Sequence, residues 1–279
     1  MNIETLTEDG YLSSPASTPD AFFDEEKCLV KQILRKPTEP AQETKWQFLK
    51  NIPIAILAVS IFQVFFHILS TAVIEKYLRF EPGKPLEIWR YATYMFVHED
   101  WSHLALNVLI QCGFASLLEA NQGRIRVLFI YALGGMTGVL GAACLHPAVV
   151  VGASGGGYSL LLANVAVLIL NFNTISYKIY RTVSISIIVL SDISYNIIHV
   201  SSKKAPQVSW QAHFFGGLTG LFLGLVIFKC KKPNKIRKIL VYMALGFYLI
   251  LVICCIGLTI QIEKCTPLQL ISFRYVYSC

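Results

Sequence analysis

Charged residues are scarce in this chain of 279 residues: Asp, Glu, Lys and Arg make up 15% of it, while hydrophobic residues make up 54%. A water-soluble protein of this length needs more charge to keep its surface hydrated. The mean hydropathy is correspondingly high, at +0.55. The composition therefore argues against an ordinary soluble domain and indicates a membrane protein.

Three other signals are missing. The net charge of +7 is not gathered into a basic stripe with interleaved aromatic residues, so no nucleic-acid partner is expected. The eight cysteines form no CxxC pair and no Cys/His spacing typical of a metal site, so no metal is expected. Met1–Gly10 is polar and acidic, unlike a secretory signal peptide.

The chain divides into a polar tail and a series of apolar runs. Residues 1–45 are rich in Ser, Thr, Pro, Glu and Lys, which predicts a largely disordered tail. A helix needs about 20 apolar residues to cross a bilayer. Seven runs fit or approach this length: 52–74, 103–120, 124–147, 152–170, 182–199, 210–228 and 239–262. We therefore expect an all-α, polytopic membrane protein.

Lysines and arginines predict the orientation of these spans, because positive loops stay in the cytosol. The strongest cluster is the loop 229–238, between the sixth and seventh runs. It shares one side with three other basic groups if the N-terminus is cytosolic. Residues 263–279 then form a luminal or extracellular tail, in which pairing of Cys265 with Cys279 stays open. The compartment is expected to be the Golgi, the endoplasmic reticulum or the plasma membrane.

Polar residues inside the runs cluster at one depth. In this topology the second, fourth and sixth runs all enter from the outer side. His103 and Asn107, Ser154, and His213 each lie near the beginning of one of these runs. Because a charge at the centre of a membrane helix costs about 2.5–3.5 kcal/mol, polar residues there call for a reason. Their common level predicts a functional site just below the outer surface.

Ser154 lies among glycines, in Gly152-Ala153-Ser154-Gly155-Gly156-Gly157-Tyr158. Taken alone, this pattern is more often a seam of small residues where two membrane helices approach closely. In the chemical interpretation, the glycines clear space around a nucleophilic hydroxyl. Backbone N–H groups at the helix start would then stabilise an oxyanion. A serine nucleophile needs a general base, and His213 is the candidate.

His213 precedes three glycines, Gly216, Gly220 and Gly224, that recur every four residues and predict a flat helix face for close packing. A lone histidine in a membrane helix is more often a hydrogen-bonded structural residue. A glycine-flanked serine at the same depth makes the general-base interpretation equally good. Tyr158, one turn after Ser154, is placed either to stack on the imidazole or for ordinary aromatic packing.

His103 and Asn107 are spaced i, i+4, so they share one helix face. They are candidates for oxyanion donors, and the alternative is a hydrogen bond between helices that fixes their register. His98, just outside the run, is interpreted as a residue that anchors a loop. Asp192, in the fifth run, has no evident catalytic partner in the sequence and is interpreted as structural.

Several motifs in this order resemble the rhomboid family of intramembrane serine proteases, over roughly residues 50–228. They are Trp89-Arg90, His98-x4-His103-x3-Asn107, Glu119, Gly152-Ala153-Ser154-Gly155, Tyr158 and Ala212-His213-x2-Gly216. The resemblance implies a six-helix core, with a seventh helix at 239–262 that looks like the eukaryotic secretase-type subgroup and is similar to insect members. The loop from Lys76 to Trp101 is similar to the family's membrane-embedded outer loop.

The resemblance also implies a mechanism that needs no cofactor. Ser154 would be the nucleophile and His213 the base of a dyad without an aspartate. His103, Asn107 and the Ser154 amide would form the oxyanion hole, with Gly152, Gly155, Tyr158, His98, Trp89, Arg90 and Glu119 in support. The substrate would be the transmembrane segment of a single-span protein, entering from the lipid between the second and fifth spans. Secretase-type members release growth-factor precursors of the epidermal growth factor type.

Two other functions stay open at this point. One is a catalytically silent rhomboid-like protein that binds client transmembrane helices for trafficking or degradation. The other is a small transporter or channel, because buried His and Asn can also line a polar path. Modification of Ser154 by a serine-directed reagent distinguishes the protease from both, and solute flux that survives Ser154→Ala would indicate transport.

Overall fold

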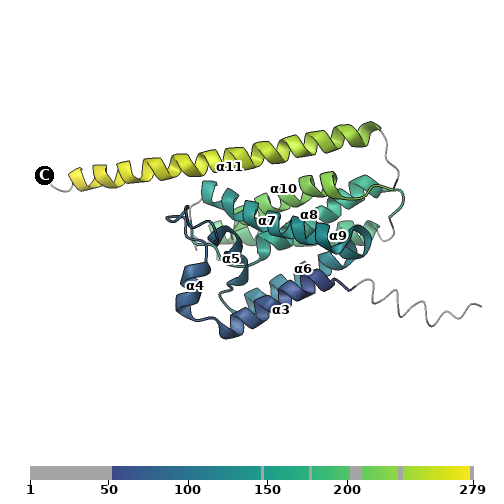
Figure 1. The fold of residues 1–279 in the computed structure, drawn as a ribbon, viewed down its shortest axis with the longest axis horizontal. Helices are drawn as coiled ribbons and strands as arrows, with labels where there is room; N and C mark the ends of the chain where they lie inside the picture. The colour runs from purple at the N-terminus through teal and green to yellow at the C-terminus, as the bar shows by residue number, and fades with distance from the viewer. Residues whose placement is uncertain (1–51, 146–147, 176–177, 202–208, 232–234, 277–279) are drawn as a thin grey trace, which may run out of the picture. The chain divides into compact units, whose positions relative to one another are not determined.

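The computed structural model describes residues 52–145, 148–175, 178–201, 209–231 and 235–276, without the side chains of 199–201 and 263–276. Helices account for most of this part of the chain (Figure 1). Their bounds are α3 Ile54–Leu69, α4 Ala72–Leu78, α5 Arg90–Thr93, a 3-10 turn Tyr94–Phe96, α6 Trp101–Gln122, α7 Arg124–Leu145, α8 Ser154–Asn171, α9 Lys178–Ser201, α10 Trp210–Ile227 and α11 Lys235–Val276. The expected all-α fold is confirmed.

Six of these helices are long and apolar enough to cross a membrane: α6, α7, α8, α9, α10 and α11. The helix α3 is shorter, with 16 residues, because Ser70 adopts an extended conformation and Thr71 caps a separate helix, α4. The first predicted run therefore holds two helices instead of one. The expected multi-pass membrane protein is confirmed, while the tail predicted at 1–45 lies outside the described residues.

The last helix differs most from its predicted run. Residues 239–262 are apolar, but α11 starts at Lys235 and continues to Val276. Helical geometry does not require apolar side chains, so the hydropathy pattern marks the part of a helix suited to lipid and not its ends. The side chains of Cys265 and Cys279 lie outside the described part of the chain, so their pairing stays a prediction.

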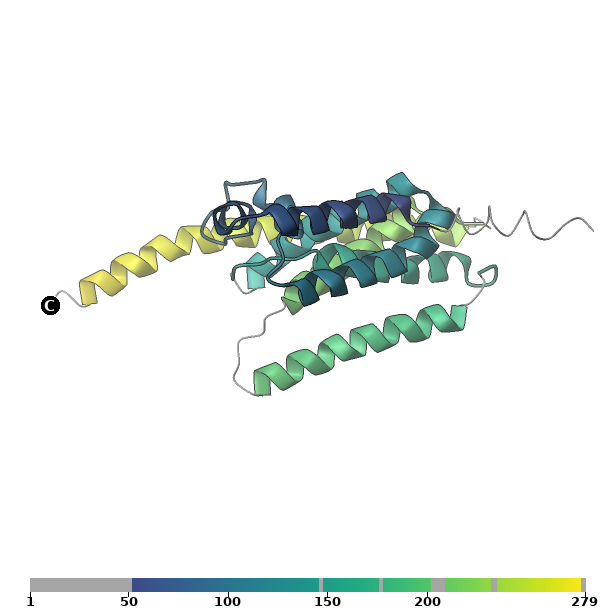
Figure 2. The ribbon, with the colours of Figure 1, turned by 90° about the horizontal axis from the view of Figure 1, so that it is seen from below.

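Helices α7, α8 and α10 form the packed centre of the bundle. In the span windows of α7 and α8, 67% of the residues are buried, against 11% in those of α9 and α11. Figure 2 shows α9 standing off from the other helices, and Figure 1 shows α11 along the outside of α10. Large apolar side chains such as Ile187 and Leu190 of α9 stay exposed, which suits a surface in contact with lipid.

Glycines on α10 allow its backbone to touch that of α8. A Cβ added at Gly216 would overlap the carbonyl group of Gly155, and one added at Gly220 would overlap the carbonyl group of Ser159. Such close approach is possible only without side chains between the helices. The flat face predicted from the four-residue glycine repeat is therefore present, and it presses α10, with His213 at its beginning, against α8.

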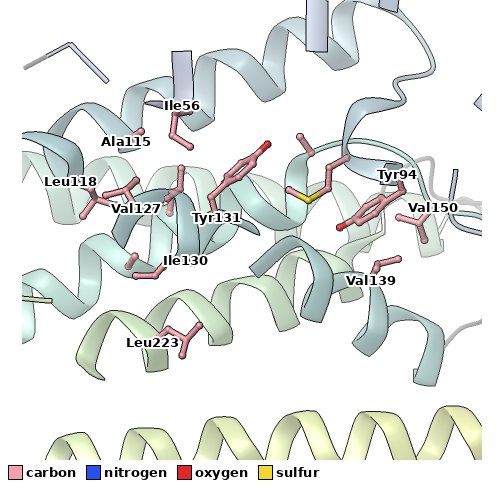
Figure 3. Packing of buried hydrophobic residues seen from close by; sticks show 14 of the residues in the cluster. Ile56, Tyr94, Ala115, Leu118, Val127, Ile130, Tyr131, Val139, Val150 and Leu223 are labelled. Carbon is pink, nitrogen blue, oxygen red and sulfur yellow. The ribbon is translucent and has the colours of Figure 1, made fainter. Parts of the chain in front are cut away.

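The apolar core continues from this seam toward α3 and α6. Figure 3 shows Ile130 and Val127 of α7 beside Leu118 of α6 and Ile56 of α3, with Leu223 of α10 below them. Each of these five side chains is almost completely buried. This core therefore packs α3 and α6 against the central helices.

A closed network of buried polar groups joins α3, α6 and α7. The Gln111 amide donates to the Gln63 side-chain oxygen at 2.7 Å, and the Tyr131 hydroxyl donates to the Gln111 oxygen at 2.9 Å. The Gln63 amide donates to Tyr131 at 3.0 Å and to the Met95 carbonyl at 3.0 Å. Because every member is satisfied, the network stabilises the register of three helices and of the loop that carries Met95.

Glu119, in the last turn of α6, caps the first turn of α3. Its carboxylate accepts hydrogen bonds from Ile56 N at 2.9 Å and Ala55 N at 3.1 Å. The residue before α3 is Pro53, whose side chain makes no capping hydrogen bond. A carboxylate at a helix N-terminus satisfies free N–H groups and interacts well with the helix dipole. Glu119 therefore supports the fold from a place outside the polar cluster around Ser154.

Replacing Glu119 by glutamine is expected to lower the free energy of unfolding by about 2 kcal/mol, because one charge-assisted hydrogen bond is lost and an amide donor then faces a backbone donor. Thermal unfolding in detergent micelles measures the difference. Glu99→Gln is the matched control, since Glu99 is exposed. Equal melting temperatures for the two variants would contradict a capping role.

Candidate active site

Ser154 is the first residue of α8, and a sharp turn at Gly152 delivers it there. Gly152 has φ +98°, a conformation that side chains with a Cβ rarely adopt. Its N–H donates to the Tyr94 carbonyl at 3.1 Å, which ties the turn to the preceding loop. Because the first turn of a helix has free N–H groups, the Ser154 hydroxyl lies beside potential backbone donors.

His103 and Asn107 approach this turn from α6. The Asp100 carboxylate caps α6 by accepting from His103 N at 2.7 Å, and the Asn107 amide donates to the His103 carbonyl at 2.9 Å. A Cβ added at Gly152 would lie 2.7 Å from His103 Nε2 and 3.7 Å from Asn107 Nδ2. The two side chains therefore lie over the backbone two residues before Ser154.

His213 lies in the first turn of α10, which the Ser209 hydroxyl caps by accepting from Ala212 N at 3.3 Å. A Cβ added at Gly155 would lie 3.5 Å from the Ala212 carbonyl oxygen, so the residues next to Ser154 and His213 are neighbours. The imidazole is 5% exposed and stacks on the Tyr158 ring, with 4.0 Å between centroids and 8° between planes. The stacking geometry that the sequence suggested for Tyr158 is present.

Asp192 of α9 has a partner that the sequence did not reveal. One oxygen of its carboxylate, Oδ2, lies 3.0 Å from His213 Nδ1. The expectation that Asp192 has no partner in the site was wrong, while its interpretation as a structural residue stays a prediction. Sequence reasoning missed it because α9 and α10 are separate helices, and spacing along the chain does not tell which face α9 turns toward α10. An acidic residue inside an apolar run was the available signal.

His98 packs against the site from the loop before α6. Its side chain is 2% exposed and meets the His103 ring edge-on, with 5.4 Å between centroids. Burial and the nearby His103 lower the pKa of His98 to about 4, so the ring is uncharged at neutral pH. His98 therefore lies beside the polar cluster, while its role as a loop anchor stays a prediction.

Trp89 and Arg90 fold the outer loop on itself. The buried Arg90 guanidinium donates to the carbonyls of Arg79 at 2.6 Å and Lys76 at 2.8 Å, and it forms an ion pair with Glu87. Trp89 stacks on Tyr77, with 5.5 Å between centroids. These partners all belong to the loop or to α4, so the structure does not bring Trp89 and Arg90 to Ser154.

A cavity of about 330 Å³ opens beside His213, between α8, α9 and α10. Most of the residues that line it are apolar, and Asp192, Asn196 and His213 are polar or ionisable members besides the Tyr158 ring. Within the described ranges, no three His, Cys, Asp or Glu side chains gather closely enough to hold a metal ion. Taken together, the site offers a hydroxyl, an imidazole with an acidic partner, and several hydrogen-bond donors, the groups that acyl transfer uses.

Comparison with known proteins identifies the family. Residues 85–230 match the Rhomboid domain. The chain is 32% identical over 186 residues to Rhomboid-related protein 2 of Mus musculus, an alignment that covers 64% of this chain and 61% of the relative. It is 34% identical over 172 residues to Rhomboid-related protein 1 of Caenorhabditis elegans, covering 61% of this chain and 48% of the relative.

A third relative carries an activity in its name. The chain is 33% identical over 139 residues to Rhomboid-like protease 5 of Toxoplasma gondii, covering 50% of this chain and 16% of that protein. The matched part thus spans about half to three fifths of the length of the first two relatives and much less of the third. Since the matched domain takes up more than half of the sequence and holds Ser154, His213, His103 and Asn107, the chain belongs to the rhomboid family.

Proposed function

We propose that the chain is an intramembrane serine endopeptidase that cleaves the transmembrane helices of single-span proteins. The observation that carries the proposal is the convergence of three helices on one turn: α8 brings Ser154, α10 brings His213 and α6 brings His103 with Asn107. Membership of the rhomboid family and a relative named as a protease support it. Ser154 is the nucleophile and His213 the general base.

The reaction is an acyl transfer in two stages. His213 Nε2 takes the proton of the Ser154 hydroxyl as its oxygen attacks a peptide carbonyl, and the proton then passes to the leaving amine. The His103 imidazole, the Asn107 amide and N–H groups at the start of α8 donate to the oxyanion that forms. A water molecule next attacks the acyl-enzyme with the same base, which releases the new carboxyl end. No cofactor takes part.

The substrate enters from the lipid, between α6 and α9. The support for this path is the sparse packing of α9, in whose span window 11% of the residues are buried. Peptide bonds in a helix are shielded by their own hydrogen bonds, so substrates with glycine or proline near the cut are favoured. Growth-factor precursors of the epidermal growth factor type are the proposed substrates. We place the enzyme in the secretory pathway, with its N-terminus in the cytosol.

Covalent labelling tests the nucleophile. A fluorophosphonate is expected to modify the purified protein at Ser154, identified by mass spectrometry of the labelled peptide, and Ser154→Ala should abolish the modification. Ser116→Ala is the matched control, because among the described residues the Ser116 hydroxyl donates to the Gly113 carbonyl of its own helix. If Ser154 stayed unmodified while the protein still bound a client transmembrane helix, the chain would be a silent rhomboid-like binding protein.

A further inference from the structure

We propose that Asp192 is a positioning residue that orients His213 for proton transfer. The inference rests on the proposed function, because it assigns a role in the same reaction. Asp192 Oδ2 lies 3.0 Å from His213 Nδ1, a normal length for an N–H···O hydrogen bond. Ser154 and His213 would remain the two reacting groups that the family resemblance implies, and Asp192 would orient His213 from a third helix.

The chemistry of the two groups selects one tautomer of His213. An ionised carboxylate can only accept hydrogen bonds, so Nδ1 must carry the proton that they share. In the neutral imidazole the other nitrogen, Nε2, is then an acceptor with a free lone pair. His213 Nε2 is buried and has no hydrogen-bond partner among the described residues. It is thus held in the form that can take a proton from a serine hydroxyl.

The surroundings of both side chains strengthen this arrangement. Stacking on Tyr158 fixes the plane of the imidazole, while Asp192 fixes its rotation within that plane. Asn196, one turn further along α9, donates to Asp192 Oδ1 at 3.3 Å and so holds the carboxylate. Most of the side chains that line the cavity next to these groups are apolar. A hydrogen bond to a charged group is stronger in such surroundings than in water.

The location of Asp192 on α9 gives the contact a further property. The bundle holds α9 less tightly than the central helices, whereas His213 lies on α10, which is pressed against α8 by its glycine face. Asp192, which orients His213, therefore lies on the helix that is packed less firmly. His213 is fully oriented only while α9 keeps Asp192 within hydrogen-bonding distance of it.

Substitution of Asp192 tests the proposal through turnover. Asp192→Asn is expected to lower kcat by roughly 10–100-fold, a part of the 10²–10⁴-fold typical of general-base catalysis, with KM within about twofold. The rate constant for fluorophosphonate labelling of Ser154 should fall in parallel, and Asp192→Glu should recover part of both. Ser194→Ala, an exposed serine on the same helix, should keep wild-type rates.

A spectroscopic measurement separates positioning from support of the fold. In protein with ¹⁵N-labelled histidine, His213 is assigned by the signal lost in His213→Ala, and it should be the Nδ1–H tautomer in the wild type. In Asp192→Asn a substantial fraction should change to the Nε2–H form, because an amide can also donate to Nδ1. A lower melting temperature with unchanged tautomer and kcat would assign Asp192 a structural role only and overturn the proposal.

The role of Asp192 and the proposed function can fail separately. Wild-type kcat in Asp192→Asn, with labelling and cleavage that still require Ser154, overturns the role of Asp192 alone. Cleavage that survives Ser154→Ala overturns the proposed function. If Asp192→Ala fails to fold, the Asn and Glu variants, which preserve size or charge, still test the role of Asp192.

Discussion

Replacing His213 by glutamine is expected to reduce kcat for a single-span substrate by about 10³-fold or more, because the variant has no side chain that can take the proton of the Ser154 hydroxyl. Glutamine retains much of the volume, so the contact between α8 and α10 should persist and KM should change little. Cleavage of a purified substrate in proteoliposomes, followed by gel electrophoresis over a range of substrate concentrations, gives both constants.

The control for this experiment is His67→Gln. His67 of α3 packs edge-on against Trp101, with 4.6 Å between centroids, and has no place in the proposed reaction. Its turnover should stay close to that of the wild type. A His213→Gln variant that is folded and labelled by a fluorophosphonate at the wild-type rate would remove His213 from the mechanism, whatever the role of Ser154.

Replacing Gly220 by alanine is expected to destabilise the protein by about 3 kcal/mol or more, the upper part of the range for overpacked cores. The added Cβ would overlap the backbone carbonyl of Ser159, and a backbone atom cannot turn aside as a side chain can. The helices α8 and α10 must therefore move apart. Since Ser154 lies on α8 and His213 on α10, activity should fall together with stability. Thermal unfolding and cleavage assays on one preparation measure both.

Gly246→Ala is the matched control for this change. Gly246 lies inside α11, and a Cβ added there would meet no atom within 4 Å. Because alanine favours the helix more than glycine does, by up to about 1 kcal/mol, this variant should be as stable as the wild type or slightly more stable. Similar losses in both variants would show that any alanine in a membrane helix has this effect and that the seam is not special.

Local patterns in the sequence predicted the features that depend on one helix or on close spacing. The hydropathy runs located the long helices because membrane spans need apolar side chains over a fixed length. The repeat at Gly216 and Gly220 predicted the close contact of α10 because spacing by four fixes a single helix face. Tyr158 lies one turn after Ser154, so stacking on His213 was one of its two interpretations, beside ordinary aromatic packing. These features depend on the composition of one segment or on spacing along one helix.

Features that depend on how two helices turn toward each other could not be predicted from the sequence. The contact between Asp192 and His213 requires the rotation of α9 about its axis, which side-chain packing sets and a hydropathy pattern does not. Glu119 caps α3 through hydrogen bonds to residues that lie 63 and 64 positions away in the sequence. No local motif predicts such a contact. The break between α3 and α4 was missed because the run stays largely apolar across Ser70 and Thr71.

The backbone contact between α8 and α10 has a consequence for how the protein can change over generations. A seam filled by side chains can be rebuilt in small steps, since a larger residue on one side can be offset by a smaller one opposite. At Gly216 and Gly220 the opposing atoms are carbonyl groups, which every amino acid carries, so no substitution across the seam can make room. These two positions are therefore fixed in composition for as long as the two helices keep this distance.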